Sequence, residues 1–216
     1  MKHTWILDNG HGGVDPDTCK YTTCPDFDWD KPSTWHKMHV HTFGPLFEGE
    51  FNRQVVARIA EKLDVLGIRY SVLVPETDDI SLRERVARAN NKFKTDKSCI
   101  FVSIHGNAFN TSAKGFEVFT SKGLTRSDAI AEVFANETES MFPYRTMRWG
   151  LSDGDKDKEA NFYVLKKTNM PAILTENFFF DNYDDALLMS SDEGQDRIAQ
   201  AHVNAIVKIE RDAREY

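Results

Sequence analysis

Three places along this chain put a metal-binding or titratable side chain where a strand ends or a helix begins. His11 follows the run WILDNG, His105 closes the apolar run IFVSI, and Glu48 and Glu50 stand at the start of a helical pattern. In open α/β sheets, ligands bind beyond the carboxyl ends of the strands. Two histidines and one carboxylate, with a position left for water, form the ligand set of a catalytic zinc site. The spacing therefore predicts such a site, with Glu48 or Glu50 as its carboxylate.

A further residue, Glu176, has the surroundings expected of a general base. It follows the apolar run AILT and precedes Asn177 and three phenylalanines. Burial raises the pKa of a carboxyl group, and a glutamate with a raised pKa can take a proton from a water beside a metal ion. The alternatives are structural: Glu176 caps a following element, Glu48 and Glu50 complement the helix dipole, and His11 is a polar loop residue.

Helix and strand patterns alternate along the chain and set the fold class. Apolar residues recur at helical spacing over 47–66, Gly67 supplies a stop, and Ser81 with Glu84 forms a capping box before a helix at 81–93. Further helices are predicted at about 127–141 and 193–214. Strands are predicted at 3–8, 69–75, 99–105, 115–121, 161–165 and 172–180. This alternation predicts a single α/β sandwich over residues 1–216, with a mostly parallel or mixed central sheet of about six strands flanked by helices.

Residues 14–46 show neither period and are predicted to be a long inserted loop. Three histidines lie within it, His36, His39 and His41. The last two alternate as on a strand edge. They could replace the glutamate as second metal ligand, or they could simply be surface residues. Cys19 and Cys24 could pair or join the histidines around a metal, although three cysteines do not describe a disulfide framework. Cys99 is expected in the core.

Composition excludes several classes of protein. The chain has 216 residues, of which 40% are hydrophobic, enough for one buried core. The net charge is −7 and the basic residues are scattered, which argues against nucleic acid as a partner. No apolar run approaches the ~18 to 20 residues that span a bilayer, and the start of the chain lacks a signal-peptide pattern. We expect a monomer that stays in the cytoplasm until released, and a solvated loop at the charge run 153–159.

Six segments, taken in chain order, resemble the zinc-dependent N-acetylmuramoyl-L-alanine amidases of the type 3 family. They are WILDNGHGG at 5–13, EGEFNRQVVARIAEKL at 48–63, SLRERVARANN at 81–91, FVSIHGNA at 101–108, GFEVF at 115–119 and ANFYVLKKTNMPAILTEN at 160–177. The family more often has Asp-Pro-Gly-His where this chain has Asp-Asn-Gly-His at 8–11. The loop at 14–46 is longer than in compact members, which implies a reshaped cleft and an altered peptide specificity. Details of the motifs resemble amidases of bacteriophages and gut-type bacteria.

The resemblance implies a ligand set, a base and a reaction. By position in the family motifs, His11, Glu48 and His105 hold Zn²⁺, with Glu50 as the fallback, and Glu176 is the catalytic base. The implied reaction is hydrolysis of the amide bond between N-acetylmuramic acid and L-alanine in peptidoglycan, as in autolysins and endolysins. The metal acidifies a water and polarises the scissile carbonyl, while Glu176 moves the proton to the leaving amine.

Three further residues are candidates for supporting roles. Asn107 is a candidate to hold substrate or its own loop, Arg85 to pair with a carboxylate of the site or of the stem peptide, and Asp8 to orient a histidine. Two rival functions remain open from the residues. One is a non-catalytic protein of the same fold that binds peptidoglycan or regulates a partner, and the other is a zinc peptidase that cuts within the stem peptide.

Overall fold

The computed structural model of the protein describes residues 2–151 and 154–212. Within these residues the central sheet has six strands: β1 (Thr4–Asn9), β4 (Tyr70–Val72), β5 (Cys99–Asn107), β6 (Phe116–Thr120), β7 (Lys158–Glu159) and β8 (Ala172–Phe179). They form one sheet in the order β4-β1-β5-β8-β6-β7, and each neighbouring pair is parallel except β6 with β8. The predicted α/β class, with a mostly parallel sheet of about six strands, is confirmed.

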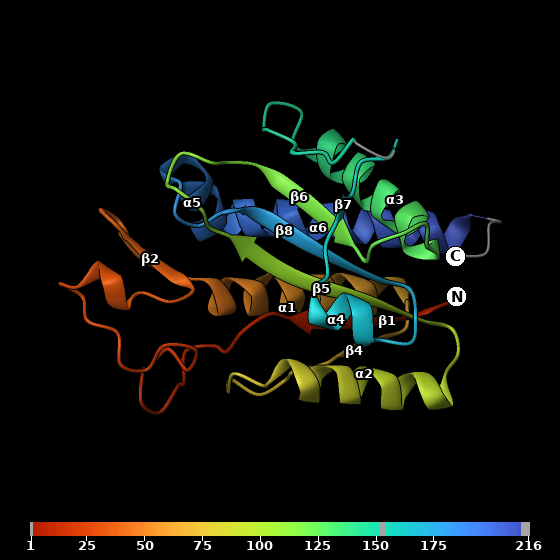
Figure 1. Ribbon diagram of the computed structural model, residues 1–216, viewed down its shortest axis with the longest axis horizontal. Coiled ribbons are helices and arrows are strands. Elements are labelled where there is room, and N and C mark those ends of the chain that lie inside the picture. Colours follow the sequence, from red (N-terminus) through yellow and green to blue (C-terminus); the bar gives the residue numbers. More distant parts are fainter. Residues whose placement is uncertain (1, 152–153, 213–216) are drawn as a thin grey trace.

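Helices cover both faces of this sheet (Figure 1). One face carries α1 (Glu48–Leu66), α3 (Arg126–Met141), α5 (Tyr183–Ser190) and α6 (Asp192–Arg211), and the other carries α2 (Leu82–Thr95) and α4 (Tyr163–Lys167). Alternate residues of a central strand enter the two cores: Trp5 and Leu7 pack in the larger one and Ile6 in the smaller. A strand covered on both faces needs such a continuously apolar run, which is why β1 and β5 read as they do.

The end of α1 and the start of α2 lie where the sequence predicted them. Gly67 ends α1 with a left-handed φ of 63°, a conformation that glycine adopts without strain. The Ser81 hydroxyl accepts a hydrogen bond from the Glu84 amide at 3.2 Å and caps α2. The Glu84 carboxylate instead accepts a hydrogen bond from Arg88. Among the described contacts, the predicted capping box is therefore present only in its Ser81 half.

Two predictions about the sheet edge were wrong. The run 161–165 is not a strand: Phe162 caps α4, whose Val164 and Leu165 enter the smaller core. Its short apolar pattern carries no period that separates helix from strand. The edge is instead β7, which comes from the charge run predicted to be a solvated loop. Asp157 of that run is buried and accepts a hydrogen bond from the Thr120 hydroxyl at 2.6 Å. Asp153, the first residue of that run, and Arg214, the last residue of the helix predicted at 193–214, lie outside the described residues.

The inserted segment, residues 14–46, contains more regular secondary structure than predicted. It contains a short 3-10 helix, Pro32–Thr34, and an antiparallel hairpin of β2 (Met38–His41) and β3 (Gly44–Phe47). A small core of Tyr21, Cys24 and Met38 holds it together. The hairpin projects at the end of the molecule where the carboxyl ends of β5 and β8 lie (Figure 1). The prediction of an irregular loop over the whole segment was therefore wrong for its second half.

The structure also shows the state of the cysteines and the character of the helices. All three cysteines in the described ranges are free, with Cys19 exposed and Cys24 and Cys99 buried. Cys99 is in the core as predicted, and the cluster of potential metal ligands found in the described part of the chain contains no cysteine. In the same part of the chain, helices long and apolar enough to cross a membrane are absent.

Candidate metal and catalytic site

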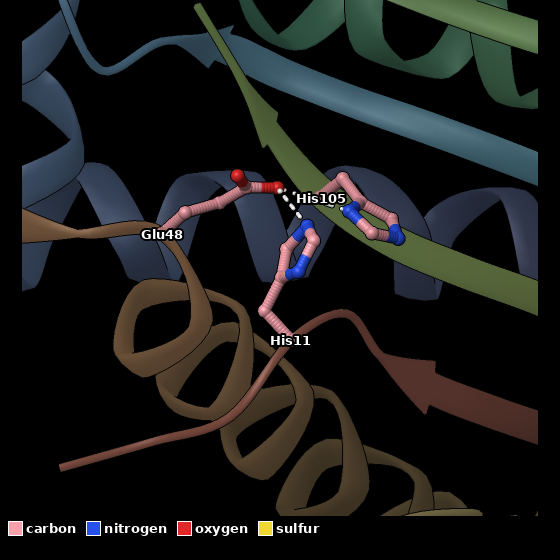
Figure 2. A group of neighbouring side chains, drawn as sticks. All are labelled: His11, Glu48 and His105. Atoms are coloured by element: carbon pink, nitrogen blue, oxygen red, sulfur yellow. Dashed lines mark hydrogen bonds and ion pairs between the residues drawn. The ribbon is translucent and has the colours of Figure 1, made fainter. Parts of the chain in front are cut away.

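His11, Glu48 and His105 meet at the carboxyl ends of β1 and β5 (Figure 2). One potential ligand atom from each lies within 4.8 Å of the others. Glu48 Oε1 is 3.2 Å from His11 Nε2 and 3.0 Å from His105 Nδ1. Glu50 is turned elsewhere, and its Oε2 accepts a hydrogen bond from the Val14 amide at 3.1 Å. Of the two glutamates left open by sequence, the structure therefore brings Glu48 to the histidines.

Close backbone packing fixes where these side chains point. His11 has a left-handed φ of 63°, which few non-glycine residues adopt and which often marks a functional site. A Cβ atom on Gly10 would lie 2.1 Å from Cε1 of His105, so glycine is required for the imidazole to lie against this turn. A Cβ on Gly49 would lie 1.8 Å from the Gly12 oxygen. These glycines let the end of β1, the start of α1 and the His105 ring approach one another.

Arg85 holds the backbone around His11 in place. Its side chain is 2% exposed and donates to Asp8 Oδ1 at 2.7 Å, to the Asn9 carbonyl at 2.7 Å and to the His11 carbonyl at 3.0 Å. The second oxygen of Asp8 accepts from the Ser103 hydroxyl at 2.6 Å. Asp8 and Arg85 thus act on His11 through the backbone of its turn, whereas the sequence had suggested a direct partner for a histidine ring.

Three residues with similar supporting roles were not predicted. Asn52 donates to the Gly10 carbonyl at 3.0 Å, and Arg53 donates to the His11 carbonyl at 2.8 Å. Asn177 donates to the His105 carbonyl at 3.0 Å. All three lie within segments already matched to the family, EFNR and LTEN, and this membership was the signal available in the sequence.

The electrostatics of the trio suit metal binding. Burial alone would raise the pKa of Glu48, but His11, His105 and then Lys37 outweigh it and lower that pKa below its ordinary value. Burial lowers the pKa of His105, which favours the neutral imidazole. The buried His11 Nε2 faces the same oxygen, Glu48 Oε1, at 3.2 Å. A carboxylate and two imidazole nitrogens that converge on one point fit the donor set of a catalytic zinc ion.

Glu176 lies beside the trio on β8, paired in register with His105 of β5. Its Oε2 is buried without a hydrogen-bond partner among the described residues. Burial and then the Glu48 carboxylate raise the pKa of Glu176 well above its ordinary value, while the Lys37 ammonium acts in the opposite direction. A cation on the trio would act in the same direction as Lys37. This is the environment predicted for a group that takes up and releases a proton.

Lys37 brings the inserted segment into the site, and sequence reasoning missed it. Its ammonium is 3.4 Å from Glu48 Oε2, and its carbonyl accepts a hydrogen bond from the Glu48 amide at 2.9 Å. The Tyr21 hydroxyl donates to the same carbonyl at 3.0 Å. Lys37 has a left-handed φ of 59°. Nothing in the residue pattern of a long loop indicated that this lysine would reach Glu48.

Among the described residues, two pockets share Glu176 and Lys37 as lining residues and differ in the rest of their walls. The hairpin pocket, about 320 Å³, is walled by Trp35, His39, Asn107, Phe180 and Asp181. The helix pocket, about 560 Å³, contains the two histidines and is walled by Ile80, Leu82, Arg85, Phe162 and Tyr163. The Asn107 amide donates to Glu117 Oε2 at 2.9 Å. The predicted residues Asn107 and Arg85 therefore line different pockets, each of which also contains Glu176.

An α/β sheet with a His–Glu–His trio at its carboxyl edge and a buried glutamate beside it defines a class of metal-dependent hydrolase. The family model of N-acetylmuramoyl-L-alanine amidases matches residues 6–208. The chain belongs to this amidase family, whose members hydrolyse the amide bond between N-acetylmuramic acid and L-alanine in peptidoglycan.

Individual relatives agree with this family. The chain is 30% identical to an endolysin of Bacillus phage SPP1 over 77% of its own length and 60% of the endolysin. It is 35% identical to the N-acetylmuramoyl-L-alanine amidase CwlM of Bacillus licheniformis over 64% of its length and 50% of that protein. The crystal structure of an N-acetylmuramoyl-L-alanine amidase from Clostridium difficile 630 superposes with a TM-score of 0.75 at 25% identity and covers 98% of both chains. The chain thus matches a whole solved amidase structure but only 50 to 60% of the length of these two relatives.

Proposed function

We propose that the protein is a zinc-dependent N-acetylmuramoyl-L-alanine amidase in which His11, Glu48 and His105 hold the metal and Glu176 handles the proton. The observation that carries this proposal is the convergence of His11 Nε2, Glu48 Oε1 and His105 Nδ1 beside the buried Oε2 of Glu176. The substrate would be peptidoglycan, met at the cell wall by a monomer released from the cytoplasm.

The side chains of the site divide the work of amide hydrolysis among them. When bound, a zinc ion would supply Lewis-acid polarisation of the scissile carbonyl and acidify water. Glu176 accepts a proton at Oε2 as the water oxygen adds to the carbonyl carbon, and it gives that proton to the amine as the carbon–nitrogen bond breaks. The products are a carboxylic acid on the lactyl group and a free amine on L-alanine, and no covalent intermediate with the protein is formed.

Asn107 and Arg85 take different supporting parts in this proposal. Asn107 lines the hairpin pocket next to Glu176 and is proposed to contact substrate there. Arg85 is proposed to position His11, because its donors are engaged by the Asp8 carboxylate and the carbonyls of Asn9 and His11. Of the two roles suggested by sequence for Arg85, pairing with a carboxylate of the site is therefore favoured over pairing with the stem peptide.

The test is digestion of purified peptidoglycan by the natural protein and by Glu176→Gln, with metal content measured and products identified by mass. We expect zinc in both proteins, release of stem peptides with a free L-alanine amine by the natural protein, and a loss of about 100- to 10,000-fold in Glu176→Gln. New amines on other stem residues would instead make the protein a peptidase. Metal binding without any cleavage would make it a wall-binding or regulatory protein.

A further inference from the structure

We propose that the inserted segment holds the glycan strand of the substrate in the hairpin pocket, while the helix pocket takes the stem peptide. This inference rests on the proposed amidase function and adds a direction to it. The amide bond cut beside Glu176 joins a glycan half and a peptide half of the substrate. Two pockets meet at Glu176 and Lys37, so each can take one half. The question is which half lies where, and the walls of the two pockets differ enough to answer it.

Aromatic rings of the hairpin and of α5 adjoin the hairpin pocket, and we call this group the ring track: Trp35, His39, His41, Phe43 and Tyr183. The last three form a cluster, since the rings of His41 and Tyr183 are also only 6.0 Å apart. Successive ring centroids are 5.7 Å, 4.6 Å, 4.8 Å and 5.7 Å apart. The rings of His41 and Phe43 are stacked, with 7° between their planes. Phe43 is 40% exposed and Tyr183 50% exposed, so both side chains are partly accessible to a ligand.

The ring track is fixed to the main body of the protein. His41 Nε2 lies 2.8 Å from the Phe180 carbonyl, which joins the hairpin to the turn after β8. Tyr183 is the first residue of α5, and α5 lies at the same end of the molecule as the hairpin (Figure 1). A surface of this kind binds with little ordering cost, because its rings are already held in place.

Asp181 supplies a polar group that points to a ligand in the hairpin pocket. It is 9% exposed, and its Oδ2 accepts hydrogen bonds from the amides of Phe109 and Thr111 at 3.0 and 2.8 Å. Its Oδ1 is buried and has no hydrogen-bond partner among the described residues, yet Asp181 lines the pocket. A buried carboxylate oxygen needs a donor, and a hydroxyl group of the ligand would supply one.

Ring faces together with a carboxylate acceptor match the chemistry of a sugar. A pyranose has an apolar face of C–H groups that packs on aromatic rings and a rim of hydroxyls that donate to carboxylates. The hairpin pocket therefore fits the glycan strand.

The helix pocket has walls of a different kind. Its outer side is formed by aliphatic and aromatic side chains of the two helices on one face of the sheet, among them Leu82, 53% exposed, and Tyr163, 41% exposed. It is also lined by the polar residues Asp79 and, from the inserted segment, Thr22 and Thr23. Mixed apolar and polar walls in a larger volume suit a short peptide with alternating side chains and amides.

The experiment compares kcat/KM for two soluble substrates with the same stem peptide, one on a single N-acetylmuramic acid and one on a strand of four sugars. The natural protein should prefer the longer strand. Tyr183→Ala should lower the ratio of the two rates about fivefold to tenfold, the size of one aromatic contact. Tyr163→Ala, a matched tyrosine of similar exposure in the helix pocket, should slow both substrates equally and leave the ratio unchanged. Tyr144→Ala, 99% exposed and outside both pockets, should change neither rate.

Two results would overturn the inference: equal rates of the natural protein on both substrates, or a fall of the ratio in Tyr163→Ala instead of Tyr183→Ala. Binding of a peptide-free strand of four sugars to zinc-loaded Glu176→Gln, measured by calorimetry, separates this inference from the amidase activity. Tyr183→Ala should weaken that binding about fivefold to tenfold. If the natural protein cuts neither substrate but this binding behaves as expected, the reaction is wrong and the glycan site stands.

Discussion

The catalytic centre and the inserted segment are built in different ways. The trio and Glu176 stand on buried strand ends and a helix start, and the backbone around them is held by buried side chains such as Arg85 and Asn52. The inserted segment has its own small core and reaches the centre mainly through Lys37 and Tyr21. The difference indicates that the reaction is fixed by the sheet, whereas the choice of substrate can change in the segment with little effect on the sheet.

The largest effect should come from replacing Glu48, and its neighbour Glu50 on α1 provides a matched control. Glu48→Gln should lose the metal and more than about 100-fold of the activity, which is the loss that removal of an outer partner alone causes. Glu50→Gln should keep both, because Glu50 contacts Val14 and Gln54 rather than the histidines. Metal content by mass spectrometry and the rate on purified peptidoglycan measure this. Equal metal loss in the two variants would make the trio wrong.

Arg85→Met tests the support behind the centre and should have the next largest effect. It leaves the Asp8 carboxylate, 1% exposed, without its cation, and a broken buried pair costs about 3 to 5 kcal/mol of unfolding free energy. Denaturant unfolding measures that loss. The double variant Asp8→Leu/Arg85→Met should recover part of the stability but still bind zinc more weakly, because in both variants the His11 carbonyl has lost one of its two donors and keeps only Arg53. Full recovery of zinc affinity would contradict the positioning role.

Lys37→Met should have the smallest effect of the three and a characteristic dependence on pH. Lys37 lowers the pKa of Glu176, so its loss raises that pKa, and a larger fraction of Glu176 is then protonated at a given pH. Since the base must be ionised, the acid limb of the kcat/KM profile should move to higher pH. The loss at neutral pH should stay below about tenfold, because an exposed ammonium is screened by solvent. An unmoved limb would contradict this role, and Lys37→Arg should restore the natural profile.

Sequence reasoning was accurate where the pattern and the packing depend on the same residues. The helical stripe of α1, its stop at Gly67 and the apolar run of β5 each reflect burial against the sheet, and all were found as predicted. The same placement brought His11, Glu48 and His105 to one edge. Periodicity alone left Glu48 and Glu50 open, since both lie at the start of α1. The turn of one helix decides which carboxylate faces the histidines.

The misses share a physical cause, which is that contacts distant in sequence decided the structure. The run 161–165 is too short for its period to choose between helix and strand, and packing on the smaller core makes part of it α4. The hairpin in the inserted segment is held by Tyr21, Met38 and the bond from His41 to the Phe180 carbonyl. Lys37 reaches Glu48 only because that hairpin folds back. None of these pairings leaves a mark on local periodicity.

The order of the ligands along the chain has a consequence for the inserted segment. The segment leaves the centre just after His11 and returns to it just before Glu48. An ion held by both residues therefore acts as a cross-link that ties off the whole stretch as a closed loop, in the manner of a disulfide. Closing a loop removes chain entropy from the open state, and that cost grows only slowly with loop length. Removal of the metal should then turn this stretch into the first site of cleavage by a protease, while the sheet beneath it stays resistant.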